Sequence, residues 1–174
     1  MAGASIPGPL GSSTNNPPID AGTLALTATP APAPASAPAA PGNAVPAAAG
    51  KKYSIDDAVK HLDANAHDKS QGQCARYVRE AIEAGGVTIP PPRPLYAKDY
   101  GAKLAGLGFS KITAEGYTPQ KGDIIVLQPP SGQSAGHIQM YNGSTWKSDF
   151  VQGTGIYPGP AYRKDEVAYE IYRP

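Results

Sequence analysis

The chain has 174 residues, a net charge of +1 and 40% hydrophobic residues. A balanced charge without a basic stripe argues against nucleic acid as a partner, and no apolar run approaches the ~20 residues that a membrane-spanning helix requires. The N-terminal residues lack a basic stretch followed by an apolar core, so no standard secretory signal is expected. These properties favour a small protein that is made in the cytoplasm and reaches any external target by another route.

Residues 1–50 differ in composition from the rest of the chain. They hold 10 of the 20 prolines, no Lys or Arg, and one acidic residue, Asp20. The Pro-Ala repeats over residues 30–49 favour polyproline II, and this composition offers little apolar surface to bury. We therefore expect residues 1–50 to form a disordered head and linker, and residues 51–174 to form one folded domain.

The first half of the domain carries helical signals. Ser54 precedes apolar residues at helical spacing and has an acidic residue at the capping position, which predicts a helix over residues 54–65. A second helix is predicted from Cys74 to Gly85-Gly86, and a third over about 96–106. The proline-rich segment 89–94 is predicted to be a loop.

The second half changes to strand signals. The apolar run 124–127 predicts a strand buried on both faces, and further strands are predicted over 137–141, 145–151 and 167–172. Asn142-Gly143 indicates a hairpin after the second of these strands. Helices followed by strands predict an α+β fold, in which N-terminal helices pack on a small antiparallel sheet.

The chain has one cysteine, Cys74, at the expected N-terminus of the second helix. Backbone N–H groups and the helix dipole favour a thiolate there, so a lowered thiol pKa is expected. A lone cysteine with a histidine elsewhere is a candidate nucleophile, and His137 begins a predicted strand. The alternatives are a buried structural thiol and a histidine satisfied by the core.

Three sequence blocks, taken in order, resemble the conserved blocks of CHAP-type amidases and peptidases, relatives of the NlpC/P60 hydrolases. The blocks are Gly72-Gln73-Cys74-Ala75-Arg76-Tyr77-Val78, Lys121-Gly122-Asp123-Ile124-Ile125 and Gly136-His137-Ile138-Gln139-Met140. The resemblance covers about residues 51–174 and implies a papain-like core, with Cys74 as nucleophile and His137 as general base acting on amide bonds of peptidoglycan. No cofactor is expected, and no metal site, because no close pair of ligands has the usual spacing.

A third residue should orient the imidazole of His137. If the hairpin loop has three residues, 142–144, then Tyr141 pairs with Thr145 and His137 lies opposite Asp149 on the same face. A two-residue turn would instead place Ser148 opposite His137 and turn Asp149 to the other face. Three-residue loops are common, so Asp149 is the predicted orienting residue; the alternative is a surface carboxylate paired with a nearby cation.

Other residues are candidates for supporting roles. Gln73 matches a glutamine that recurs beside the oxyanion site of CHAP domains. Its side-chain amide, or the backbone N–H of Cys74, can donate a hydrogen bond to a tetrahedral oxyanion. Gln71 is a candidate for the same role, and the alternative for both glutamines is exposure to solvent. Trp146, Tyr157 and Tyr162 are candidates for the wall of a groove that binds glycan or peptide, the alternative being core packing.

These features predict a peptidoglycan-degrading cysteine amidase or endopeptidase. The segment 148–152 and the terminal Tyr-Arg-Pro most resemble amidase toxins that bacteria deliver into competitors, for instance by type VI secretion. That resemblance implies action in the periplasm or cell wall of a target cell, with a secretion-system carrier and an immunity protein as partners. A phage lysin or tail enzyme, an acyl-transferring thiol enzyme and a non-catalytic wall-binding module are the alternatives that the sequence leaves open.

Overall fold

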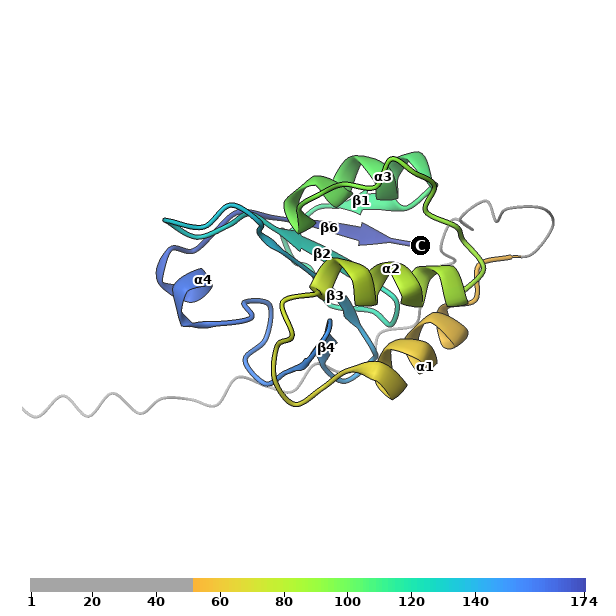
Figure 1. Ribbon diagram of the computed structural model, residues 1–174, viewed down its shortest axis with the longest axis horizontal. Helices are drawn as coiled ribbons and strands as arrows, with labels where there is room; N and C mark the ends of the chain where they lie inside the picture. Colours follow the sequence, from red (N-terminus) through yellow and green to blue (C-terminus); the bar gives the residue numbers. More distant parts are fainter. Residues whose placement is uncertain (1–51) are drawn as a thin grey trace, which may run out of the picture. The chain divides into compact units, whose positions relative to one another are not determined.

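The computed structural model describes residues 52–174, which are drawn in colour in Figure 1. In chain order the elements are α1 (Ile55–Asn65), α2 (Cys74–Ala84), a short 3-10 helix η2 (Ala97–Asp99), α3 (Tyr100–Gly106), β1 (Ser110–Ile112), β2 (Ile124–Leu127), β3 (His137–Tyr141), β4 (Trp146–Lys147), β5 (Val151–Gln152), α4 (Pro160–Lys164) and β6 (Tyr169–Arg173). The head and linker predicted for residues 1–50 lie outside the described residues. None of the helices in the described part of the chain has the length and hydrophobicity of a membrane span.

The helices lie close to where the sequence predicts them. Ser54 caps α1, since its Oγ accepts a hydrogen bond from the backbone N–H of Asp57 at 3.2 Å. The third predicted helix is confirmed as η2 followed directly by α3. The buried residues of α1 and α2 lie at helical spacing and form their contact with the core: Ala58, Val59 and Leu62 on α1, and Val78, Ala81 and Ile82 on α2. Figure 1 shows α2 lying across the sheet with α1 beside it.

The strands form one six-stranded sheet, in the order β1-β6-β2-β3-β4-β5, and every neighbouring pair is antiparallel. All four residues of β2 are buried, because β2 lies at the centre of the sheet. In the pairing of β2 with β3, Leu127 lies opposite His137. The α+β fold expected from the sequence is confirmed.

The sheet has a hydrophobic cluster on each face. Ile138 and Met140 of β3 belong to the larger cluster with the helices α1 to α3, whereas Ile125 and Leu127 of β2 belong to the smaller one. Side chains alternate between the two faces along a strand. His137 therefore points to the face of the smaller cluster.

The hairpin loop after β3 is longer than predicted. Tyr141 pairs with Trp146, and the backbone N–H of Asn142 donates to the carbonyl of Thr145. The Asn142 side chain closes this loop, since its Oδ1 accepts the backbone N–H groups of Ser144 at 2.9 Å and Thr145 at 2.8 Å, as asparagine commonly does in turns. The predicted pairing of Tyr141 with Thr145 is therefore wrong.

The strand predicted over residues 145–151 is wrong in its extent. It consists of β4 and β5, which pair with each other while the chain turns back at residues 148–150. In this turn Ser148 Oγ donates to Asp149 Oδ1 at 3.0 Å, a local side-chain bond of the kind that competes with a continuing strand. The sequence also does not predict β1 or the short helix α4.

A buried carboxylate anchors β6. Asp123 accepts two hydrogen bonds from the Arg173 guanidinium, both at 2.8 Å. The Tyr117 hydroxyl and the backbone N–H of Gln120 also donate to it, each at 2.8 Å. A buried charge needs partners of this kind, so the Gly-Asp block before β2 has a structural role.

Candidate active site

Cys74 is the first residue of α2 and follows the loop Ser70–Gln73. Gly72 in this loop has a φ of 70°, a left-handed conformation that glycine adopts without steric cost. The backbone N–H groups of Ile138 and of the first turn of α2 act to lower the pKa of the partly buried Cys74 thiol. Because Ile138 directly follows His137, the structure brings the candidate nucleophile to the start of β3.

His137 is the first residue of β3 and is 6% exposed. Gly136 before it has a φ of 68°, and a Cβ there would lie 2.4 Å from the carbonyl oxygen of Leu127 and 2.9 Å from the Cβ of Lys98. The backbone N–H of Lys98 donates to the carbonyl of Ala135 at 3.1 Å, which holds these segments together. Glycine is required at this close approach, and the packing around it fixes where His137 enters the strand.

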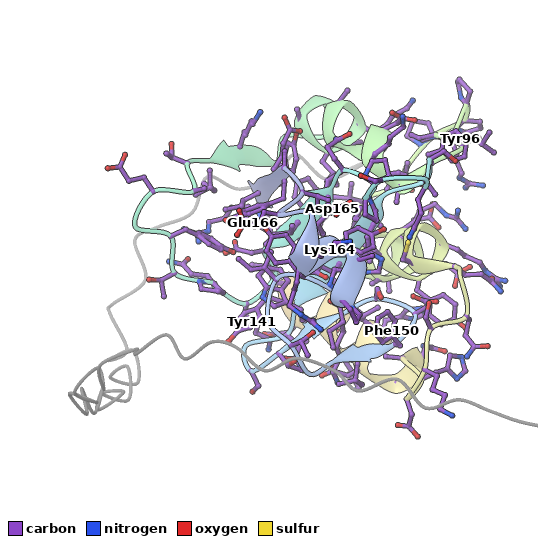
Figure 2. All side chains as sticks on the ribbon, turned by 90° about the vertical axis from the view of Figure 1, so that its left-hand side faces the viewer. Tyr96, Tyr141, Phe150, Lys164, Asp165 and Glu166 are labelled. Carbon is purple, nitrogen blue, oxygen red and sulfur yellow. The ribbon has the colours of Figure 1, made fainter. Side chains whose placement is uncertain are left out.

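Two aromatic rings flank the imidazole. Phe150 and Tyr162 each lie 6.1 Å from the His137 ring, centroid to centroid. Burial, and then the charge of Cys74, raise the pKa of Tyr162 to about 12, so this residue of α4 borders both the thiol and the imidazole. In Figure 2 Phe150 and Tyr141 lie apart from each other in the lower part of the domain.

Trp146 is placed in the core and not in a groove. It is 3% exposed, and its ring lies 5.1 Å from that of Tyr141 within the smaller cluster. The predicted role of Trp146 in substrate binding is therefore wrong, because a large ring gains more free energy from burial than from lining a wet surface. Tyr157 packs partly buried against the same cluster, with its ring 6.2 Å from that of Tyr169, and its groove role stays a prediction.

Asp149 is fully buried in the turn between β4 and β5. The sequence predicts it on a strand opposite His137, but the structure brings it to the loop before Cys74. Its Oδ2 accepts hydrogen bonds from the backbone N–H groups of Gln71 at 2.6 Å and Gln73 at 3.1 Å. The predicted register is wrong because both the hairpin loop and the fold-back after β4 shift the residues that follow.

The charge of Asp149 is stabilised by further donors. Ser70 Oγ donates to Oδ2 at 3.2 Å, and Ser148 Oγ donates to Oδ1. Burial raises the pKa of Asp149, but the hydrogen bonds from the two backbone amides and the two hydroxyls outweigh burial and hold the pKa below its usual value. The charge of this carboxylate acts to raise the pKa of the nearby His137, against the larger effect of burial, which lowers it.

Gln152 contacts the imidazole directly. It is 2% exposed, and its Nε2 lies 2.8 Å from Nε2 of His137. Its backbone is held opposite Trp146 in the ladder, and Thr145 Oγ1 donates to its carbonyl at 2.7 Å. The sequence does not single out Gln152, because the fold-back of β5 that brings it to His137 leaves no mark in the strand pattern.

Gln73 occupies the N-cap position of α2 with its side chain exposed. Its Oε1 accepts a hydrogen bond from Arg76 at 3.1 Å, and its backbone N–H is bound by Asp149. The residue directly precedes the nucleophile in the chain, and its side-chain oxygen is bound to Arg76. Its part in an oxyanion site stays a prediction.

Burial determines the charges of the Cys-His pair. It raises the pKa of the Cys74 thiol, against an opposite effect of the backbone N–H of Ile138 and with a contribution from Asp149 in the same direction as burial. Burial also lowers the pKa of His137 to about 4, and Asp149 offsets this only in part. The lowered thiol pKa predicted from the helix N-terminus is therefore wrong, because the cost of desolvating the charged form outweighs the helix dipole. At neutral pH the pair consists of a thiol and a neutral imidazole.

Comparison with known proteins places the chain among bacterial effectors. No protein-family model matches it, and no curated protein is similar to it, so the resemblance to CHAP-type amidases stays a prediction. It is similar to the crystal structure of the native type VI effector-immunity complex Tae3-Tai3 from Ralstonia pickettii, with 45% sequence identity and a TM-score of 0.65 over 70% of this chain and 98% of that chain. The selenomethionine form of the same complex gives 45% identity and a TM-score of 0.62 over 67% and 99% of the two chains.

This likeness confirms the papain-like α+β arrangement that the sequence predicts. It extends over nearly the full length of the relative, at an identity far above the level at which only a fold is shared. The chain belongs to the family of the type VI effector Tae3.

Proposed function

We propose that the protein is an antibacterial effector that hydrolyses amide bonds in peptidoglycan, as a cysteine amidase or endopeptidase. The observation that carries the proposal is the convergence of Cys74, at the N-terminus of α2, with the start of β3, where the backbone N–H of Ile138, the residue after His137, acts on the pKa of the thiol. A thiol beside an imidazole is the arrangement required for nucleophilic attack on a carbonyl. The membership in the Tae3 family supports the effector role.

The reaction starts from the neutral pair. Cys74 Sγ attacks the carbonyl carbon while its proton passes to His137, and the tetrahedral intermediate then expels the amine, which takes that proton from the imidazolium. The remaining thioester is hydrolysed by a water that His137 deprotonates, which releases the acid and restores the thiol. The exposed amide of Gln73 is the candidate donor to the oxyanion.

Asp149 supports this chemistry as a positioning residue. Its carboxylate binds the backbone amides of Gln71 and Gln73, so it holds the loop from which Cys74 enters α2. Its negative charge also favours the imidazolium that forms on His137. This role replaces the direct orientation of the ring that the sequence predicts.

The partners follow from the same reasoning. Tae3 was crystallised with its immunity protein Tai3, and we infer that this chain has an immunity partner of its own, which covers the Cys74 site. A secretion-system carrier would deliver it to the periplasm or cell wall of a target cell, where peptidoglycan peptide is the substrate.

The test is digestion of purified sacculi by Cys74→Ala and His137→Ala, with His61→Ala on α1 as a matched control. Each of the first two substitutions removes one half of a unit that acts together, so release of soluble muropeptides should fall by roughly a thousandfold or more. The control should digest like the wild type, and mass spectrometry of the products identifies the bond that is cleaved. A folded Cys74→Ala protein that still digests sacculi would disprove the mechanism.

A further inference from the structure

The buried partner of the His137 ring is an amide and not a carboxylate. We propose that Gln152 is the positioning residue of His137, and that its side-chain oxygen selects the ring tautomer that can accept the Cys74 proton. The inference rests on the proposed function, in which His137 is the base. It gives Gln152 the role of orienting the imidazole, which the sequence predicts for Asp149.

The contact is short and shielded from water. Gln152 and His137 are 2% and 6% exposed, and their Nε2 atoms are 2.8 Å apart. Asp149 makes its hydrogen bonds to the loop before Cys74 and to Ser148. Gln152 is therefore the residue that can fix both the plane and the tautomer of the imidazole.

The tautomer determines whether the ring can act as a base. A neutral imidazole carries one N–H and one lone pair. Since Gln152 occupies Nε2, Nδ1 is the nitrogen left to exchange a proton with Cys74. Nδ1 can accept that proton only when Nε2 carries the hydrogen, and a buried Nε2–H needs an acceptor.

The side-chain oxygen of Gln152 can serve as this acceptor. The amide Nε2 faces the ring, while Oε1 is buried without a hydrogen-bond partner among residues 52–174. A half-turn of the amide exchanges the two atoms within nearly the same outline and gives Oε1 the Nε2–H of His137 as donor. The amide can therefore pair with either form of Nε2, donating to the bare nitrogen and accepting from the protonated one.

When Nε2 of Gln152 faces the ring, a hydrogen-bonded path also links this amide to the buried carboxylate of Asp149. Gln152 Nε2 lies 3.5 Å from Ser148 Oγ, which itself donates to Asp149 Oδ1. The two residues thus divide the positioning: Gln152 holds the ring of His137, and Asp149 holds the loop of Cys74.

The chain offers a matched control in Gln139. It lies on β3 on the same face of the sheet as His137 and is fully buried. Its Nε2 donates to the carbonyl of Ile156 at 2.8 Å, and its Oε1 also lacks a partner within the described part of the chain. Replacing it by leucine removes a buried amide and its hydrogen bond to Ile156, so it disturbs the core in a way comparable to Gln152→Leu, but it leaves the partner of the imidazole in place.

The experiment compares wild type, Gln152→Leu, Gln152→Glu and Gln139→Leu. Nitrogen-15 NMR of histidine-labelled protein reports the tautomer of His137, and kcat and KM are measured on muropeptides released from sacculi by a muramidase. For Gln152→Leu we expect a smaller share of the Nε2–H tautomer and a kcat lowered roughly ten- to hundredfold at unchanged KM, by analogy with residues that orient catalytic histidines at metal sites. The carboxylate of Gln152→Glu still accepts the Nε2–H, so it should restore that tautomer, recover most of kcat and shift the pH profile to higher pH.

The outcomes separate this inference from the proposed function. A kcat and a His137 spectrum that are unchanged in Gln152→Leu would overturn it, and so would an equal loss of kcat in Gln139→Leu, which would indicate general destabilisation. If the wild type does not cleave muropeptides, the proposed function fails, while the tautomer shift in Gln152→Leu still decides whether Gln152 positions the ring.

Discussion

Protonation of His137 should destabilise the folded protein. Burial lowers its pKa to about 4, whereas an exposed histidine in the unfolded chain titrates near pH ~6.5. The unfolded state therefore binds the proton more tightly, so the free energy of unfolding is at its full value above the unfolded pKa and falls as the pH drops toward 4. At about 1.4 kcal/mol per pKa unit, the full contribution of His137 is about 3 kcal/mol.

The assay is urea unfolding of the wild type and His137→Gln, followed by the fluorescence of Trp146. The variant has no imidazole to titrate, so groups that both proteins share cancel in the difference between them. From pH ~7.5 to pH ~4.5 the wild type should lose roughly 2–3 kcal/mol more than the variant. Asp149 does not enter this window, because its pKa is held below its usual value and its contribution is lost only at lower pH.

An equal loss in the two proteins would refute the reasoning. It would mean that the His137 ring keeps an ordinary pKa in the folded state. The imidazole would then be partly protonated near neutral pH, and the starting point of the proposed reaction would have to change.

Three further predictions concern the thiol, the buried carboxylate and the N-terminal residues. Because burial raises the pKa of Cys74, alkylation by iodoacetamide should be slow at pH ~7 and accelerate above pH ~8.5; a plateau already reached at neutral pH contradicts this. Asp149→Asn keeps the shape but loses acceptors for the loop amides, so urea unfolding should show a loss of about 2–3 kcal/mol together with slower sacculus digestion, and a wild-type result would remove Asp149 from the positioning role. A chain that starts at Lys51 should digest sacculi and unfold thermally like the full chain while killing of neighbouring cells falls, whereas loss of digestion in vitro would show that residues 1–50 take part in the folded domain.

The elements that depend on local signals are predictable from the sequence. Ser54 caps α1 as its position predicts, and the apolar run of β2 forms the buried central strand. The placement of Cys74 at a helix start and His137 at a strand start follows from the same local patterns. The sequence therefore contains the fold class and the candidate nucleophile and base.

The surroundings of the pair could not be predicted in the same way. The Asn142 side chain lengthens the hairpin loop, and the chain then folds back after β4. A shift of one residue in register moves every later side chain to the other face. Gln152, and not Asp149, therefore contacts the His137 ring. The direction of the Cys74 pKa shift could not be predicted for a similar reason. The helix start is a local feature of the sequence, whereas the burial that outweighs its effect on the pKa arises only in the folded domain.

The hydrogen bonds of Asp149 bear on how the protein is synthesised. They join residues that lie 78 and 76 positions apart along the chain, and such distant contacts form late, because a long loop must close first. A ribosome completes Cys74 well before it adds the turn that fixes the loop in front of it. A nascent chain that ends before that turn carries Cys74 on a loop that Asp149 does not yet hold. The proposed hydrolase site is therefore complete in the producing cell only after the whole sheet has assembled.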